Sequence, residues 1–107
     1  MEIIETSVFT RQIMELLSDD EYARLQFDLV LRPEQGALIP RSGGIRKIRW
    51  AGSGRGKRGG IRVIYYWQAD EYQIFMLLAY AKNIQDDLTP AQLSILRKLV
   101  KQEFKRG

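Results

Sequence analysis

The sequence contains no cysteine and no histidine among its 107 residues. Without cysteine there is no disulfide, no thiolate nucleophile and no cysteine-bound zinc site. Without histidine the chain lacks the usual general base at neutral pH and the commonest metal ligand. Any catalysis must therefore use lysine, arginine, tyrosine, carboxylate or hydroxyl groups, and we expect no metal or cofactor.

Long apolar runs are also missing. No stretch approaches the roughly 18 apolar residues of a membrane-spanning helix. The N-terminal segment MEIIETSVF lacks the basic start and apolar core of a secretory signal. A hydrophobic content of 45% is enough for a compact core at this length. We therefore expect a single domain over residues 1–107, in a cytoplasmic protein without membrane contact.

Charge is concentrated in one segment. Residues 41–62 carry eight cationic side chains and no acidic one, whereas the rest of the chain has nine basic against thirteen acidic side chains. Seven of the nine glycines lie in the same segment. Such a strip concentrates the electrostatic field and predicts a polyanionic ligand, most commonly a phosphate backbone. The eight cations are Arg41, Arg46, Lys47, Arg49, Arg55, Lys57, Arg58 and Arg62.

The hydrophobic pattern predicts the element order β-α-α-β-β-β-α. Helical spacing of apolar residues and the capping-box pair Ser18 and Glu21 predict a helical hairpin over residues 7–32. Thr89, followed by Pro90 and Gln92, predicts the start of a last helix. We expect an α+β fold with a small, mostly antiparallel sheet and helices on one side. The predicted strands are residues 2–5, 45–50, 61–67 and 73–81, with loops over 34–44 and 51–60.

Pairing of the predicted strands brings basic side chains together. Lys47 and Arg49 share one face of the strand 45–50, and the next strand carries Arg62. Whether Arg62 shares their face depends on a hairpin register that the sequence does not reveal. Other polar side chains expected near this rim are Arg55, Lys57 and Arg58 in the glycine-rich loop, and Tyr80, Lys82 and Asn83 at the end of the last strand.

Several cations and a tyrosine can cleave RNA without histidine. The 2′-hydroxyl of RNA is an internal nucleophile, so an enzyme need only position it, remove its proton and stabilise the phosphorane. Arginine binds phosphate oxygens in a bidentate way, and a lysine crowded by cations has a lowered pKa that suits acid–base catalysis. DNA lacks this hydroxyl, so the reaction would be specific to RNA.

Less specific interpretations fit the same residues. A loop rich in glycine, arginine and lysine is more often a solvated hairpin or a non-catalytic phosphate contact. Asp86 and Asp87 could form a carboxylate site. They are more simply explained as turn residues before the last helix, where the helix dipole favours acidic groups.

Two segments together resemble the RelE/HigB group of toxins from bacterial toxin–antitoxin pairs. They are GGIRKIRWAGSGRGKRGGIRVIYYW and YAKNIQDDLTPAQ. The G-G-x-R-K-x-R strand, the GKRGG hairpin and the Y-x-K-N…DLT ending are similar to the HigB-like branch of the RelE superfamily. The likeness covers nearly the whole chain, because the predicted element order also matches.

The resemblance implies a ribosome-dependent mRNA endonuclease, or mRNA interferase. Such toxins cut mRNA in the ribosomal A site without metal and leave a cyclic phosphate. The resemblance also implies a cognate antitoxin, in this branch usually a helix-turn-helix protein, through which the toxin meets DNA only indirectly.

The resemblance also assigns residues by motif position. It implies catalytic roles for Lys47, Arg49 and Arg62, and for Lys82, which stands where many relatives carry an arginine. Tyr80, at the end of the preceding strand, is our further catalytic candidate. The general base stays open among Tyr80, Lys82 and Lys47, because the chain has no histidine and no tyrosine after Tyr80. The resemblance implies RNA contacts for Arg55, Lys57 and Arg58 of the GKRGG loop, and we expect Arg46 and Asn83 to bind RNA as well.

Two other functions remain as alternatives. One is a non-catalytic module, such as a decayed toxin, that binds only RNA or an antitoxin. The other is a phage-derived, DNA-associated factor, which would bind duplex DNA in a salt-sensitive way without toxicity.

Overall fold

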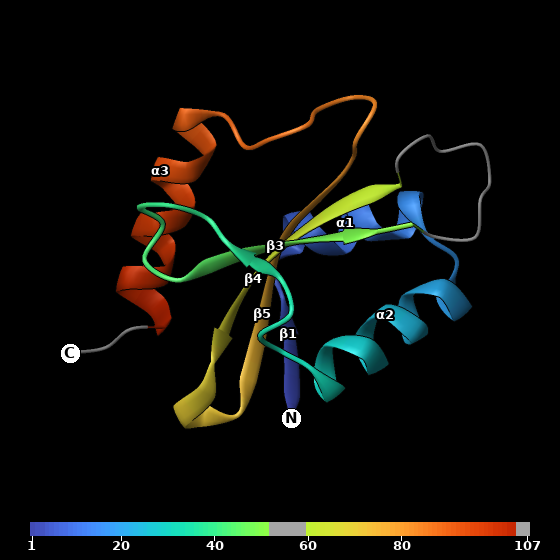
Figure 1. Ribbon diagram of the computed structural model, residues 1–107, viewed down its shortest axis with the longest axis horizontal. Coiled ribbons are helices and arrows are strands. Elements are labelled where there is room, and N and C mark those ends of the chain that lie inside the picture. Colours follow the sequence, from blue (N-terminus) through green and yellow to red (C-terminus); the bar gives the residue numbers. More distant parts are fainter. Residues whose placement is uncertain (52–59, 105–107) are drawn as a thin grey trace.

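The computed structural model describes residues 1–51 and 60–104, so most of the predicted loop 51–60 lies outside the described residues. The elements follow the predicted order (Figure 1). In chain order they are β1 (Glu2–Glu5), α1 (Ser7–Leu16), α2 (Asp19–Leu31), β2 (Ala37–Leu38), β3 (Ile45–Trp50), β4 (Ile61–Gln68), the 3-10 turn η1 (Ala69–Glu71), β5 (Gln73–Ala81), α3 (Pro90–Leu99) and the π-helical turn η2 (Val100–Phe104).

The strands form one sheet in the order β1-β5-β4-β3-β2. β1 pairs with β5 in parallel, and the other neighbours are antiparallel. The mostly antiparallel α+β sheet is therefore confirmed. One strand was not predicted: the expected loop 34–44 contains the two-residue edge strand β2.

The helix starts are confirmed by their caps. Ser18 and Glu21 form a capping box at α2, and Thr89 and Gln92 form one at α3 with Pro90 in its first turn. Thr6 caps α1 by accepting a hydrogen bond from the Phe9 N–H. Within the described parts of the chain, none of the helices has the length and apolar character needed to cross a bilayer.

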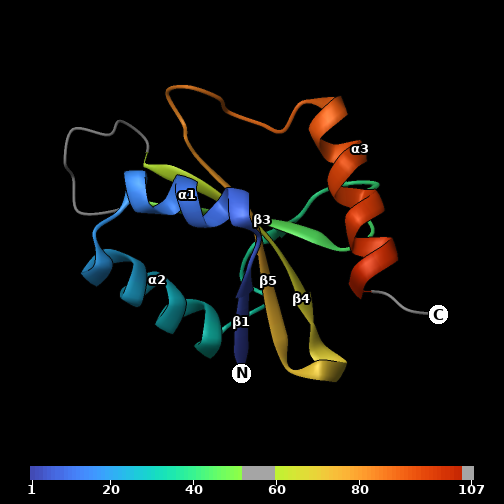
Figure 2. The ribbon, with the colours of Figure 1, turned by 180° about the vertical axis from the view of Figure 1, so that it is seen from behind.

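α1 and α2 cover one face of the sheet (Figures 1 and 2). Their buried side chains, among them Phe9 and Leu25, pack against strand residues such as Val63 and Met76. α3 lies against the opposite face, where Leu96 joins a second core.

The expectation of helices on one side is therefore wrong. β4 and β5 are buried on both faces along most of their length, so each face must be covered. The signal was present in the sequence, since IRVIYYW and QIFMLLAYA are nearly continuous apolar runs rather than alternating ones. Strands of this kind call for helices on both sides of the sheet.

A β-bulge interrupts β5. Between the pairs Tyr65–Met76 and Ile64–Leu78, β5 advances by two residues while β4 advances by one. Leu77 is therefore an extra residue without a partner on β4.

The bulge changes which face the end of β5 presents. Ile74 and Met76, before the bulge, belong to the core under α1 and α2. Strict alternation would place Tyr80 with them, because it is an even number of residues further along. Instead, Tyr80 belongs to the core on the α3 side.

α1 satisfies the backbone groups around the bulge. The Thr6 hydroxyl donates to the Leu77 carbonyl at 2.9 Å, while it also accepts the capping hydrogen bond of α1. Nearby, the Gln12 side-chain oxygen accepts a hydrogen bond from the Ala79 N–H at 2.9 Å. The pairing of β1 with β5 ends at Glu5 and Met76, so these two side chains supply hydrogen-bond partners to β5 at and beyond the bulge, where β1 no longer runs alongside.

Thr6→Val should therefore destabilise the fold by about 1–2 kcal/mol, because it removes both the helix cap and the partner of a carbonyl at the bulge. Thr6→Ser keeps the hydroxyl and should lose less than about half of that amount. Chemical denaturation of the three proteins measures the difference. A valine variant as stable as the wild type would show that the two hydrogen bonds of the hydroxyl contribute nothing measurable at this position.

Candidate active site

The strand register places the predicted basic residues on one face. Arg49 lies opposite Arg62, and Arg62 in turn lies opposite Tyr80. Lys47 lies two residues before Arg49 on β3, opposite Ile64. Cross-strand partners project from the same face of a sheet, so the three cations and the tyrosine share the α3 side. We call this group, Lys47, Arg49, Arg62 and Tyr80, the cationic face.

Exposure increases across the cationic face. The Arg62 side chain is only 5% exposed, the Lys47 side chain is 18% exposed, and Arg49 is exposed. Arg62 donates a long hydrogen bond of 3.4 Å to the Ile61 carbonyl. A guanidinium in this position is shielded from water, so its electrostatic effect on an approaching anion is stronger than at an open surface.

Tyr80 lies beside these cations with its ring buried. Among the described residues its hydroxyl has no hydrogen-bond partner. Burial raises the pKa of Tyr80 to about 12, and the negative charge of Asp87 adds to the effect, whereas Arg62 opposes it. The hydroxyl is therefore protonated at neutral pH and is available as a donor.

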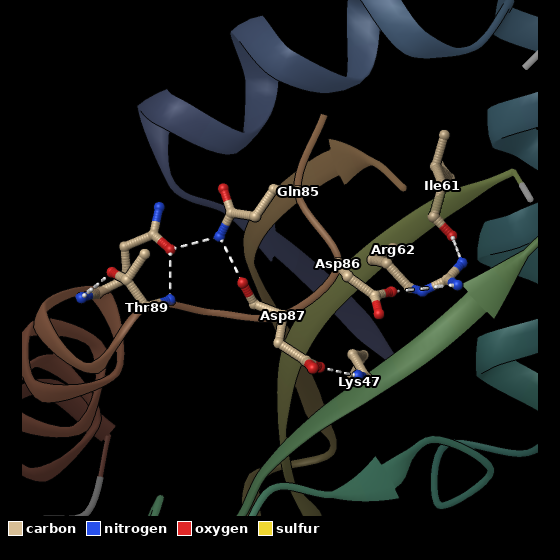
Figure 3. Close-up of polar contacts among 8 residues, drawn as sticks. Lys47, Ile61, Arg62, Gln85, Asp86, Asp87 and Thr89 are labelled. Atoms are coloured by element: carbon tan, nitrogen blue, oxygen red, sulfur yellow. Dashed lines mark hydrogen bonds and ion pairs between the residues drawn. The ribbon is translucent and has the colours of Figure 1, made fainter. Parts of the chain in front are cut away.

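Two carboxylates complete the site, and the sequence interpretation had not placed them there. In the segment between β5 and α3, the Asp87 carboxylate lies 2.5 Å from the Lys47 ammonium, and the Asp86 carboxylate lies 3.8 Å from the Arg62 guanidinium (Figure 3). The hydrogen bond from Lys47 lowers the pKa of Asp87. The interpretation as simple turn residues therefore misses their main contacts.

A hydrogen-bond network holds this segment. The Gln85 side-chain amide donates to the Asp87 carbonyl at 2.8 Å and to the Gln92 side-chain oxygen at 2.6 Å. The same Gln92 oxygen accepts from the Thr89 N–H in the capping box of α3. Figure 3 shows this chain of contacts from the start of α3 to the Asp87 backbone.

Other predicted residues lie apart from this group or outside the described residues. Lys82 and Asn83 are exposed in the turn after β5, and the Lys82 N–H donates to the Gly60 carbonyl at 3.1 Å. Arg46 projects from the opposite face, where its guanidinium donates to the carbonyls of Glu34 and Gly36, both at 2.8 Å. The structure therefore does not bring Arg46 to the cationic face. The predicted residues outside the description are Arg55, Lys57 and Arg58.

Tyr80→Phe tests the state of the hydroxyl. The raised pKa means that the folded protein keeps Tyr80 protonated while an unfolded tyrosine ionises from pH 10.0. The contribution of Tyr80 therefore lowers the free energy of unfolding as the pH rises from 10 to about 12. Three other tyrosines have raised pKa values and act with the same sign, so only the comparison with the variant isolates Tyr80.

At neutral pH, Tyr80→Phe should be as stable as the wild type or slightly more stable, because it removes a buried hydroxyl without breaking a hydrogen bond to a described residue. Above pH 10 it should lose stability less steeply. Urea denaturation at several pH values provides the measurement. A variant that loses stability as steeply as the wild type would contradict the assignment.

Comparisons with known proteins agree with this architecture. The family model described as the RelE toxin of the RelE/RelB toxin–antitoxin system matches residues 1–106. Among solved structures, the chain is similar to Escherichia coli toxin RelE in the free state, a mutant with two arginines replaced by alanine. The TM-score is 0.52 at 13% identity, over 79% of this chain and 86% of that one. That likeness shows the fold, whereas the family model spans nearly the whole sequence, and the chain therefore belongs to the RelE family of toxins from toxin–antitoxin systems.

Proposed function

We propose that this toxin is a ribosome-dependent mRNA endonuclease of the HigB-like branch. The observation that carries the proposal is the cationic face, where Lys47, Arg49 and Arg62 share one side of the sheet with a protonated tyrosine. Family membership supports the toxin role, and the arrangement of side chains supports phosphate as the group that is bound.

The cations would bind and stabilise the scissile phosphate. Arg49 and Arg62 lie directly opposite each other on neighbouring strands, so both can approach one phosphodiester. Arginine matches phosphate oxygens with paired N–H donors, and Lys47 adds a point charge beside them. We propose that Arg62 stabilises most of the negative charge of the phosphorane, because burial of its guanidinium strengthens the attraction between the two groups. Further RNA contacts are proposed for Arg55, Lys57, Arg58 and Asn83.

The reaction would be an internal transfer. The 2′-oxygen forms a bond to phosphorus while the bond to the 5′-oxygen breaks, which gives a 2′,3′-cyclic phosphate and a 5′-hydroxyl. The proton of the 2′-hydroxyl would go to a lysine in its neutral amine form. Lys82, in the turn after β5, is the first candidate for this acceptor and Lys47 is the second, while Tyr80 would donate a proton to the leaving 5′-oxygen. The raised pKa of Tyr80 favours this donor role over that of general base.

The proposal includes partners. The family implies an antitoxin, and we propose a helix-turn-helix protein whose acidic or apolar surface neutralises the toxin. Ribosome and mRNA are the proposed targets, which places the protein in the cytoplasm.

Primer extension on a reporter mRNA in a reconstituted translation system tests the function. We expect cuts only when ribosomes are present, at positions in the frame of the A site. Tyr80→Phe should reduce the cleavage rate by roughly 10²- to 10⁴-fold, the usual contribution of a general acid. An absence of cuts from folded protein under both conditions would favour the non-catalytic binding module instead.

Substitution of Lys82 separates a proton acceptor from a positive charge. Lys82→Ala should restore growth in a toxicity assay while the protein stays folded. Lys82→Arg keeps the charge but cannot accept a proton, because arginine stays protonated in proteins. We expect Lys82→Arg to bind RNA and to fail in cleavage. An active arginine variant would show that Lys82 acts only through its charge, and a toxic alanine variant would remove Lys82 from the mechanism.

A further inference from the structure

We propose that Asp86 and Asp87 are internal competitors of RNA, which occupy the cationic face until an mRNA displaces them. The inference rests on the proposed function, because it names the regulation of the same site. It also gives a physical reason for a toxin of this kind to act on RNA that the ribosome presents and to spare free RNA.

The two ion pairs are arranged like contacts to a nucleic-acid backbone. Consecutive residues of one segment place their carboxylates against two different cations, Lys47 and Arg62. These are cations that an RNA phosphate would need. RNA and the acidic segment therefore cannot make the same contacts at the same time, and binding of RNA must break both ion pairs.

The competitor is effective because it is attached to the same chain. A tethered group acts at an effective concentration in the millimolar range or above. The Gln85 network increases this further, since it fixes the Asp87 backbone to the start of α3. Free RNA therefore binds more weakly than it would bind to a face without these carboxylates. mRNA held in place by a ribosome has a high effective concentration of its own and can displace them.

The carboxylates are exposed enough to move. The side chains of Asp86 and Asp87 are 66% and 72% exposed. Each ion pair has one solvated carboxylate, so it contributes less to folding stability than a fully buried pair, and asparagine keeps the shape and an acceptor oxygen of aspartate. Replacing both aspartates with asparagine should therefore leave the protein folded, so that changes in RNA binding can be measured directly.

The first experiment measures RNA affinity without cleavage. The ligand is a fluorescently labelled 2′-fluoro RNA, which lacks the attacking hydroxyl, and the readout is fluorescence anisotropy at fixed salt. The double variant Asp86→Asn, Asp87→Asn should bind roughly two- to thirty-fold more tightly than the wild type, because each exposed ion pair contributes a factor of roughly one and a half to five. Unchanged or weaker binding would overturn the proposal.

A matched control accounts for net charge. The double variant Asp70→Asn, Glu71→Gln changes the charge by the same amount in the exposed turn η1, which joins the other ends of β4 and β5. Its RNA affinity should stay close to that of the wild type. If it gains as much affinity as the variant at Asp86 and Asp87, the effect comes from overall charge and the proposal fails.

A double-mutant cycle tests direct competition at Lys47. Asp87→Asn should tighten RNA binding in the wild type and have little effect in a Lys47→Met background, where the contested cation is gone. An equal gain in both backgrounds would contradict competition for Lys47.

Cleavage of free RNA is the last readout. The variant Asp86→Asn, Asp87→Asn should cut unmodified RNA without ribosomes faster than the wild type. If it binds more tightly but cuts more slowly, with or without ribosomes, the aspartates take part in the chemistry and the proposal is overturned. If no protein cuts RNA under any condition, the proposed function fails, whereas the affinity measurements still decide whether the aspartates compete with RNA.

Discussion

The β-bulge at Leu77 is the constraint on which the site depends. It shifts the end of β5 by one residue relative to β4, so that Tyr80 faces Arg62 and not the core under α1. Bulges often redirect a side chain next to a functional site. Here, the N-cap residue Thr6 and the α1 residue Gln12 form hydrogen bonds with backbone groups of β5 at the bulge and just after it. Side chains on one face of the sheet thus help to fix which residues of β5 face the other side.

The two-sided burial of the sheet has a second consequence for the site. Arg62 belongs to a strand whose other residues are mostly buried, and this position removes its guanidinium from water. A buried charge is tolerated only with compensating partners. The segment between β5 and α3 provides part of this compensation through Asp86. The electrostatic strength of the site and the presence of nearby carboxylates therefore have the same physical origin.

The main helices and strands could be predicted from the sequence, because each of them has a strong local signal. Capping boxes at Ser18 and Thr89 and apolar runs in the strands are local properties. The convergence of Lys47 with Arg49 also followed from alternation along one strand. The position of Arg62 relative to them did not, because register depends on how two strands pair. Tyr80 was expected near the site because it ends a neighbouring strand, but simple alternation from Ile74 and Met76 would have placed it on the opposite face.

The role of Asp86 and Asp87 could not be predicted because it depends on where a connecting segment lies in space. One electrostatic clue existed, since a strip of eight cations repels itself and needs nearby negative charge. Any carboxylate that relieves this repulsion also opposes the binding of RNA, because it neutralises the charge that attracts phosphate. A site built from cations must therefore both limit the repulsion among its own charges and keep enough positive charge to attract phosphate. Carboxylates on a tethered, exposed segment can do so, since they compensate the charge of the free protein and can be displaced by a substrate held close by.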